Sequence, residues 1–277
     1  MQDGRLKAAL KQARDVAETV TTRVTKVPPR RIRKGISPLW FDYTLTGRDQ
    51  LEFFTELAGL KPTDRVLDIG CGVGRIARPL TGYLSGGGSY DGFDILPYMI
   101  EWDRANISSK FPNFRFHLAE IASTTNEAQA ATLDAAEYRF AFGDDTFDFA
   151  YAGSLFTHLV PSGTENYLAE TARTLTSGGR LVATFNLYNE QTQTRNPGRN
   201  LGTAWPYDLG HYRLKEKDAP ESNVAYEEGW LREAYKRAGL TILEPLRPDA
   251  SYSPARSPKR GHAPHLWYSV GIIAIKD

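Results

Sequence analysis

Short apolar runs alternate with longer amphipathic stretches through the middle of the chain. The runs predict five strands, at residues 65–70, 89–94, 114–118, 147–151 and 179–185. The amphipathic stretches predict helices at residues 47–60, 73–84, 96–110 and 163–175. Strands that alternate with helices at this spacing form a mostly parallel sheet with helices on both faces. The pattern predicts an α/β, doubly wound fold with its ligand site at the carboxyl ends of the strands.

The last third of the chain continues the pattern less regularly. A helix at 227–238 is followed by Gly239, a residue typical of helix ends. Strands at 240–243 and 266–275 bring the predicted sheet to seven strands. Three stretches predict loops, namely an Ala/Thr-rich insertion at 121–138, a polar lid-like segment at 188–224 and a proline-rich loop at 245–264. Together with the preceding elements they form one predicted domain, residues 47–277.

Residues 1–46 precede this domain as a basic arm. Apolar residues at helical spacing predict an amphipathic helix from about residue 4 to residue 25. Residues 1–35 hold ten basic and three acidic side chains, so they carry +7 and leave −6 on the other 242 residues. In one interpretation the helix packs on its own domain or on a second subunit, which would give a homo-oligomer. A membrane-surface helix and a flexible basic tail are the alternatives, and the lack of aromatic residues on the apolar face weakens the membrane interpretation.

Composition excludes several classes of protein. The 277 residues carry a net charge of +1, which makes a nucleic-acid partner unlikely as the default. The single cysteine, Cys71, excludes a disulfide framework and a metal site made of cysteines alone. No stretch approaches 18 apolar residues, so no transmembrane helix is expected. The first 30 residues lack an apolar run, which argues against a secretory signal and favours a cytoplasmic protein.

The strongest local motif is a glycine-rich turn after the first predicted strand. Glycines at 70, 72 and 74 let the backbone adopt positive φ and let a ligand approach it closely. Arg75 stands where a dinucleotide-binding fingerprint requires glycine, and no Lys-Ser/Thr pair completes a phosphate-binding loop. Asp68 would repel a pyrophosphate but attract an ammonium group or a ribose hydroxyl. The turn therefore favours a cationic cofactor without phosphate.

Asp94 ends the second predicted strand, 24 residues after Gly70. An acidic side chain at this place accepts hydrogen bonds from the hydroxyls of a ribose. The alternative is a structural role, in which Asp94 caps the helix that starts near Leu96.

These residues carry a family resemblance over about 120 positions. The segments VLDIGCGVGR, GFDI, FDFAYAGSLFTHL and RTLTSGGRLVATF follow one another between Arg65 and Leu187. In this order they resemble the class I S-adenosylmethionine-dependent methyltransferases, which have a Rossmann-like sheet of seven strands. Four further segments, VPPRRIRKG, GCGVGRIARPL, YDGFDILPYMIEW and SLFTHL, resemble a bacterial subfamily that methylates small molecules or glycans.

The resemblance implies S-adenosyl-L-methionine as cofactor and assigns residues to it. Asp68 and the backbone at Gly70, Gly72 and Gly74 would hold its methionine end, with Cys71 and Arg75 in the same turn. Cys71 is interpreted as a packing residue and not as a nucleophile. Asp94 would bind the ribose, Ile95 would lie beside the adenine, and Glu120 would meet the adenine amino group. Ser154 would offer its backbone carbonyl to the cofactor ammonium.

His158 is the predicted catalytic residue. It follows the fourth strand by a few residues, and its ordinary pKa suits a general base for transfer to a hydroxyl. A histidine that only braces the loop before Pro161 is the alternative. Weaker substrate-contact candidates are His211, Asn186, Glu190 and the aromatic residues Tyr207, Tyr212, Tyr226 and Trp230. No carboxylate–histidine cluster with metal-ligand spacing is evident, so no metal is predicted.

Three functions remain open. The first is methyl transfer to a hydroxyl of a small molecule or glycan. The second is N- or C-methyl transfer, which depends less on a base. The third is a noncatalytic protein that binds the cofactor and interacts with partners. Methylation of DNA or amide nitrogens is disfavoured, because Ala152-Gly-Ser-Leu155 stands where such enzymes have Asn/Asp-Pro-Pro-Tyr/Phe.

Overall fold

The computed structural model describes residues 27–33, 42–123, 133–189, 204–248 and 269–277. The predicted helix at residues 4–25 lies outside these ranges, and so do Glu190 and most of the proline-rich loop. In the described parts of the chain, no helix combines the length and apolar character needed to cross a membrane.

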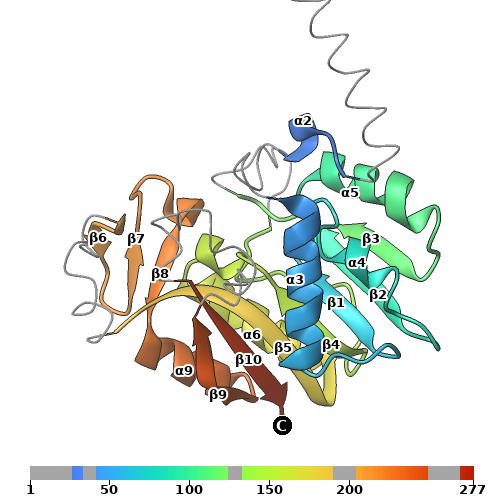
Figure 1. Cartoon of the computed structure of the whole chain (residues 1–277). Coiled ribbons are helices and arrows are strands. Elements are labelled where there is room, and N and C mark those ends of the chain that lie inside the picture. Colours follow the sequence, from blue (N-terminus) through green and yellow to red (C-terminus); the bar gives the residue numbers. More distant parts are fainter. Residues whose placement is uncertain (1–26, 34–41, 124–132, 190–203, 249–268) are drawn as a thin grey trace, which may run out of the picture.

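A twisted sheet forms the centre of the molecule (Figure 1). Five parallel strands stand in the order β3-β2-β1-β4-β5, and β10 and β9 continue the sheet in antiparallel pairing beyond β5. The strands are β1 (Arg65–Ile69), β2 (Ser89–Asp94), β3 (Phe114–Leu118), β4 (Phe147–Ala152), β5 (Leu175–Tyr188), β9 (Leu240–Pro248) and β10 (Ser269–Lys276). This arrangement confirms the predicted fold class of seven mostly parallel strands.

The strand order reverses between β1 and β4. From β1 the sheet continues to β2 and β3 on one side, and to β4 and β5 on the other. In an open parallel sheet, a crevice forms at this switch point, outside the carboxyl ends of the strands. The loops after β1, β2 and β4 therefore define where a ligand site is expected.

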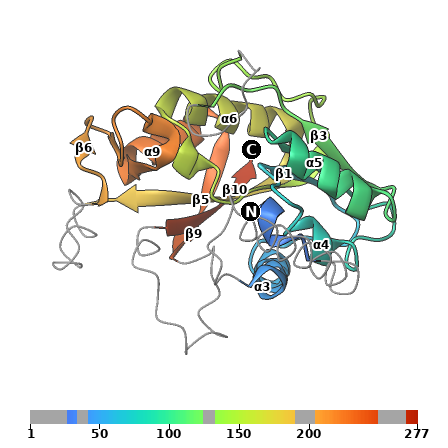
Figure 2. The ribbon, with the colours of Figure 1, turned by 90° about the horizontal axis from the view of Figure 1, so that it is seen from above.

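Helices cover both faces of the sheet (Figure 2). One face carries α3 (Tyr43–Glu56), α4 (Ala77–Leu80) and α5 (Pro97–Asp103), and the other carries α6 (Pro161–Thr174) and α9 (Glu228–Arg237). The short helix α2 (Arg30–Arg33) lies near the end of α5 (Figure 1). Each helical layer buries its own apolar cluster against the sheet, which explains why the parallel strands carry buried apolar side chains on both faces.

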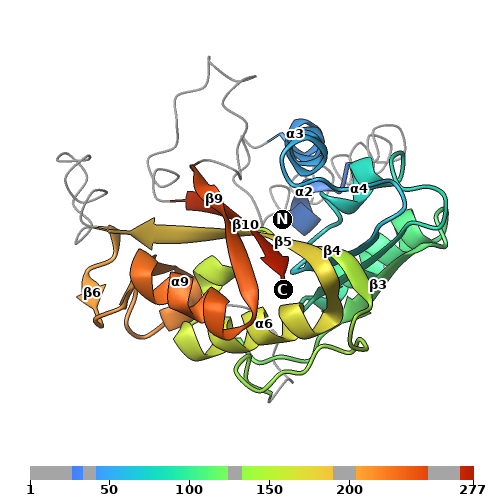
Figure 3. The same cartoon turned by 90° about the horizontal axis from the view of Figure 1, so that it is seen from below.

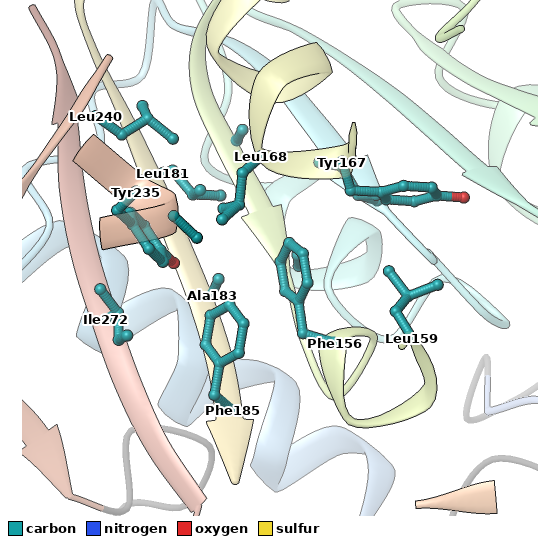
Figure 4. Close-up of a cluster of buried hydrophobic side chains, with 14 of the residues drawn as sticks. Phe156, Leu159, Tyr167, Leu168, Leu181, Ala183, Phe185, Tyr235, Leu240 and Ile272 are labelled. Atoms are coloured by element: carbon teal, nitrogen blue, oxygen red, sulfur yellow. The ribbon is translucent and has the colours of Figure 1, made fainter. Parts of the chain in front are cut away.

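The core under α6 and α9 is built around aromatic side chains (Figure 4). Phe156 stacks on Phe185 with ring centroids 4.5 Å apart, and Phe185 also meets Tyr235 from α9 edge to face. Because Phe156 belongs to the loop after β4, this buried pair anchors that loop to β5. The core thereby fixes the backbone that leads to His158.

The described part of the predicted lid-like segment contains strands. β6 (Tyr207–Asp208), β7 (Tyr212–Leu214) and β8 (Val224–Glu227) extend the sheet from the far end of β5. The prediction of a loop missed them because the long strand β5 (Figure 3) continues to Tyr188, three residues beyond its predicted end, and pairs there with β8. The amide nitrogen of Asn186 donates to the carbonyl of Val224 at 3.0 Å and strengthens this junction.

Three predicted boundaries also differ from the structure. α3 begins at Tyr43, because Asp42 caps it by accepting from two backbone N–H groups, so the predicted boundary at 46/47 falls inside a helix. The predicted helix at 73–84 is reduced to α4, since turns follow the glycines. β9 includes Pro245 and Pro248, which the proline-rich loop was expected to contain. An edge strand tolerates proline, and β9 pairs only with β10 among the described strands.

Candidate active site

The glycine turn follows β1 as predicted, and its glycines are conformationally required. Gly70, Gly72 and Gly74 have φ values of +77°, +56° and +65°. The backbone nitrogens of Gly70 and Cys71 both donate to the carbonyl of Phe93, at 2.9 and 3.0 Å. Because side chains at positive φ are strained, other residues would displace the turn from the end of β2.

The Asp94 carboxylate joins this turn to the segment after β2. It accepts from the backbone nitrogen of Gly72 at 2.9 Å and from that of Leu96 at 3.1 Å. The bond to Leu96 is the one expected if Asp94 caps the helix that starts near Leu96, which was the structural alternative to ribose binding. A carboxylate has about four acceptor positions, so it can still accept from hydroxyl groups of a ligand. The neighbouring Ile95 is half-buried and packs on the core beneath α6.

Asp68 lies behind the turn and is 1% exposed. Tyr90, a residue that sequence reasoning missed, donates its hydroxyl to this carboxylate at 2.6 Å. Burial raises the pKa of Asp68 to about 7, although the Tyr90 bond and the charge of Arg75 act in the opposite direction. Gly92, on the adjacent strand β2, leaves room for Tyr90 and Cys71. A Cβ at Gly92 would lie 2.8 Å from Cys71 Cβ and 2.9 Å from Tyr90 Oη.

A third acidic side chain, Asp103, lies beneath the turn and was also missed. It is 0% exposed, and neither carboxylate oxygen has a hydrogen-bond partner among the described residues. A Cβ on Gly74 would come within 2.7 Å of Asp103 Oδ1, so the third glycine gives room to this carboxyl. Burial raises the pKa of Asp103, and the charges of Asp94 and Asp68 raise it further.

Helix α3 supports the turn from the opposite side. The Tyr43 hydroxyl donates to the carbonyl of Val73 at 2.8 Å in a buried contact. Gly47, one helical turn later, lies against the chain after the glycines, because a Cβ there would be 2.7 Å from the carbonyl oxygen of Arg75. These contacts join residues about 30 positions apart, and no local motif in the sequence indicates them.

The remaining predicted turn residues have different surroundings. Arg75 is half-buried, and its charge acts on Asp68. Cys71 is buried, and burial raises the pKa of its thiol, which disfavours the reactive thiolate. Glu120 is exposed just after Ala119, whose backbone nitrogen donates to the carbonyl of Asp94 at 3.0 Å. The structure therefore brings Glu120 to the same sheet edge as Asp94.

Ser154 follows β4 and is exposed at this edge with a left-handed backbone, φ +59°. Its backbone nitrogen donates to Thr184 Oγ1 at 2.7 Å, and its carbonyl accepts from the hydroxyl of Thr157 at 2.8 Å. Such a conformation costs a serine about 1–2 kcal/mol relative to glycine. The two threonine hydroxyls stabilise it and leave one lone pair on the carbonyl.

His158 is exposed at the end of the 3₁₀ turn η2 (Phe156–His158). Its Nδ1 lies 2.8 Å from the carbonyl oxygen of Glu221, in the 3₁₀ turn η3 (Pro220–Ser222). A carbonyl oxygen only accepts, so Nδ1 carries the hydrogen. In the neutral ring, Nε2 then has the free lone pair of a proton acceptor. Sequence reasoning missed Glu221, since the two residues lie 63 positions apart.

Several of the weaker substrate-contact candidates are packed against, or hydrogen-bonded to, other parts of the protein. Asn186 is buried and supports β8, as described above. Trp230 stacks on Tyr226 with ring centroids 5.4 Å apart and on the exposed His211 with centroids 5.0 Å apart. These rings therefore pack on one another beside the outer sheet, the part of the sheet formed by β6, β7 and β8. Within the described residues, no group of three or more His, Cys, Asp and Glu side chains is arranged to hold a metal ion.

The residues around the glycine turn fit a cationic ligand that carries hydroxyl groups. Three carboxyl groups, those of Asp68, Asp94 and Asp103, surround the glycine turn. The charge of Arg75 acts on Asp68, and that of Arg78 acts on Asp103. Asp94 retains acceptor positions for hydroxyls, and the glycines keep side chains away from the backbone. A sulfonium and an ammonium on one adenosine-containing molecule match this chemistry, whereas a pyrophosphate does not.

Comparisons with known proteins agree with this assignment. Residues 66–179 match the family model described as a methyltransferase domain. A TehB-like SAM-dependent methyltransferase from Corynebacterium glutamicum is 17% identical, with a TM-score of 0.50 over 95% of this chain and 99% of that chain. A SAM-dependent methyltransferase from Methanosarcina mazei is 21% identical, with a TM-score of 0.52 over 78% and 94% of the two chains.

A third similar structure contains the product form of the cofactor. It is 1,6-didemethyltoxoflavin-N1-methyltransferase from Burkholderia thailandensis, solved with 1,6-didemethyltoxoflavin and S-adenosylhomocysteine. It is 18% identical, with a TM-score of 0.53 over 97% of this chain and 89% of that chain. The similar structures share the fold, and the family model matches the segment that holds the glycine turn, Asp94 and His158. Residues 66–179 therefore match a methyltransferase domain, in a chain that has the fold of S-adenosylmethionine-dependent methyltransferases.

Proposed function

We propose that the enzyme transfers a methyl group to a hydroxyl of a small molecule or glycan, with His158 as general base. The observation that carries the proposal is the 2.8 Å hydrogen bond from Nδ1 of His158 to the carbonyl of Glu221. This bond leaves Nε2 unprotonated in the neutral ring, on an exposed side chain at the carboxyl edge of the sheet. A histidine that only supported its loop would not need this exposed acceptor nitrogen.

In the proposed site, the residues around the glycine turn bind the cofactor. Asp94 accepts from the ribose hydroxyls, and Ile95 and Glu120 lie on the adenine side. The turn from Gly70 to Arg75, with Asp68 behind it, and the carbonyl of Ser154 hold the methionine end. The carboxyl groups of Asp68, Asp94 and Asp103 favour a positively charged ligand over a phosphate, because a nearby cation stabilises the ionised form of a carboxyl group whereas an anion opposes it.

S-adenosylmethionine, when bound, supplies a methyl group attached to a positively charged sulfur. The acceptor oxygen attacks the methyl carbon in line with the sulfur, and the carbon–sulfur bond breaks to leave S-adenosylhomocysteine. The protein aligns the acceptor hydroxyl, and this positioning accounts for much of the rate. Nε2 of His158 takes the hydroxyl proton as the oxygen attacks, and Nδ1 stays bonded to Glu221. The imidazolium that forms is stabilised, because a carbonyl oxygen accepts its Nδ1–H throughout.

Cofactor binding is tested first, by calorimetric titration with S-adenosylhomocysteine. Asp94→Ala removes the two backbone bonds and the proposed ribose contacts, so affinity should fall about hundredfold, as expected for two hydrogen bonds to a charged group. Asp64→Ala is the matched control, since Asp64 also accepts from a turn nitrogen, that of Lys61, at the opposite end of β1. Equal affinity in Asp94→Ala and in the wild type would contradict the proposed ribose site.

The general base is tested by turnover on a panel of hydroxylated small molecules and glycans. His158→Ala should lower kcat by about 10²–10⁴-fold, the usual contribution of a general base, with the affinity for S-adenosylhomocysteine unchanged. His117→Gln is the control, because His117 lies on β3 and bonds Asp91 at 2.8 Å, away from the loop after β4. An unchanged kcat in His158→Ala would show that His158 is not the base.

N-methyl transfer is the second candidate, and one observation favours it. The structurally similar enzyme from Burkholderia thailandensis is by name an N1-methyltransferase. A neutral amine loses its proton after the transfer, so His158 would then contribute little. The same His158→Ala measurement, made with amine acceptors, separates the two functions. Cytoplasmic location and self-assembly through the N-terminal arm stay predictions of the sequence.

A further inference from the structure

Two of the hydrogen bonds of Glu221 reach segments far from it in the sequence. Its backbone carbonyl accepts from Nδ1 of His158, after β4, at 2.8 Å. Its side-chain Oε2 accepts from the hydroxyl of Ser123, after β3, at 2.9 Å. The residue is half-buried in η3, just before β8. Glu221 thus joins the segments that follow β3 and β4 to the outer sheet.

The backbone around His158 is held by other contacts. Phe156 stacks on Phe185 in the core, and Thr157 donates to the carbonyl of Ser154. The nitrogen of His158 donates to the carbonyl of Leu155 at 2.8 Å. With the backbone fixed, the remaining freedom at His158 is rotation of the ring and the choice of tautomer. The bond to the Glu221 carbonyl restricts both.

We propose that the Ser123–Glu221 hydrogen bond positions η3 so that the Glu221 carbonyl holds His158 as the Nδ1–H tautomer. Glu221 and Ser123 are positioning residues in this proposal, because they act through His158. The inference rests on the proposed function only for its catalytic consequence. The tautomer itself is a property of the protein without cofactor or acceptor.

The geometry explains why a side-chain bond is needed at this place. η3 is a single turn of three residues, and its internal bond runs from the nitrogen of Ser222 to the carbonyl of Ala219. On the outer-sheet side, Lys215 donates its backbone nitrogen to the carbonyl of Asn223. The bond from Ser123 fixes η3 from the other side, toward β3. Loss of this bond is expected to let the carbonyl of Glu221 shift relative to the ring.

The test is nitrogen NMR of the histidine side chains in the protein without ligands. The ¹⁵N shifts of Nδ1 and Nε2 report which nitrogen carries the hydrogen, and the His158→Ala spectrum identifies the signals of His158. Wild-type His158 should be mainly Nδ1–H at high pH. Ser123→Ala and Glu221→Ala should each shift the tautomer ratio by about fivefold toward Nε2–H, the ratio that one neutral hydrogen bond controls.

Two further variants exclude a general loss of structure. Glu221→Gln keeps an oxygen that accepts from Ser123, so it should retain the wild-type tautomer. Ser109→Ala is the matched serine control, because the Ser109 hydroxyl donates to the carbonyl of Ala105, in its own helical segment, at 2.8 Å. The double variant Ser123→Ala/Glu221→Ala should shift the ratio no further than either single change, since both remove the same bond.

The outcomes separate this inference from the proposed function. An unchanged tautomer ratio in both Ser123→Ala and Glu221→Ala would overturn the inference, whatever the activity. If the ratio shifts and the proposed function holds, Ser123→Ala also lowers kcat by a similar factor, with the affinity for S-adenosylhomocysteine unchanged. A shifted ratio with full activity in His158→Ala would leave the positioning role intact and refute the general base.

Discussion

The two halves of the proposed site are held in different ways. Around the glycine turn, backbone nitrogens bond to Phe93 and Asp94, and buried carboxyl groups lie directly beneath. Around His158, the contacts are long-range bonds between exposed or half-buried loops, such as those of Glu221 to His158 and to Ser123. The first half is part of the core of the fold, whereas the second is assembled on its outside.

This difference separates binding from turnover. Changes beneath the glycine turn should affect stability and cofactor affinity together, because the same buried bonds serve both. Changes around η2 and η3 should affect turnover and leave affinity and stability almost unchanged, because exposed bonds contribute little to folding.

The largest effect is expected from the buried carboxyl of Asp68. Its pKa is raised from 3.8 to about 7 in the folded protein, chiefly by burial. The folded state therefore holds a proton that the unfolded state has lost above pH 4. The stability that this proton gives is complete below about pH 4 and is lost as the pH rises through 7, by at most about 4 kcal/mol.

Chemical unfolding of the ligand-free protein between pH 4 and pH 8 measures this loss. Asp68→Asn keeps an acceptor for Tyr90 but cannot ionise, so its stability should decline less over this range than that of the wild type. Asp148→Asn is the opposite case, because the hydrogen bond from Arg65 lowers the pKa of Asp148. That carboxylate gives stability that is lost as the pH falls. Identical pH profiles for Asp68→Asn and the wild type would contradict the raised pKa.

A smaller effect is expected at Tyr43, where α3 meets the glycine turn. Tyr43→Phe leaves the buried carbonyl of Val73 without its partner and should lower the free energy of unfolding by about 1–2 kcal/mol. Because the carbonyl belongs to the turn, affinity for S-adenosylhomocysteine should fall as well, by about fivefold for one neutral hydrogen bond.

Tyr83→Phe is the control for this change. Tyr83 also donates its hydroxyl to a backbone carbonyl, that of Leu60 at 2.7 Å, but before β1 and away from the turn. It should lose stability and keep its affinity, which calorimetric titration and urea unfolding measure side by side. Loss of affinity in both variants would mean that α3 has no particular connection to the cofactor half of the site, the half around the glycine turn.

The sequence predicted the cofactor half well because its determinants are local. Gly70, Gly72, Gly74 and Asp94 act through the backbone of neighbouring turns, so their types and spacing already indicate the site. Tyr43 and Asp103 were missed, since they reach the turn only when α3 and α5 pack beside it. A buried tyrosine or aspartate in a helix gives no signal of the partner it will meet.

The acceptor half of the site, the half around His158, was predicted less well for a related reason. His158 follows a strand end, and that position alone made it a candidate. Its partner Glu221 lies in a polar segment whose composition predicts a loop, and only the pairing of β5 with β8 brings the segment to the site. Pairing between distant strands depends on the whole sheet, so no local pattern of residues 188–224 indicated it.

The smallest effect is expected at Ser154, between the two halves. Glycine adopts φ +59° without strain, which favours Ser154→Gly by about 1–2 kcal/mol, but its greater freedom in the unfolded chain offsets about 0.5–1 kcal/mol. The free energy of unfolding should therefore rise by no more than about 1.5 kcal/mol. The backbone keeps its conformation, so the carbonyl proposed for the cofactor ammonium stays in place and affinity should not change. Urea unfolding and titration with S-adenosylhomocysteine measure both quantities. A stabilised variant with weakened binding would show that the exposed Ser154 hydroxyl, and not its carbonyl, contacts the cofactor.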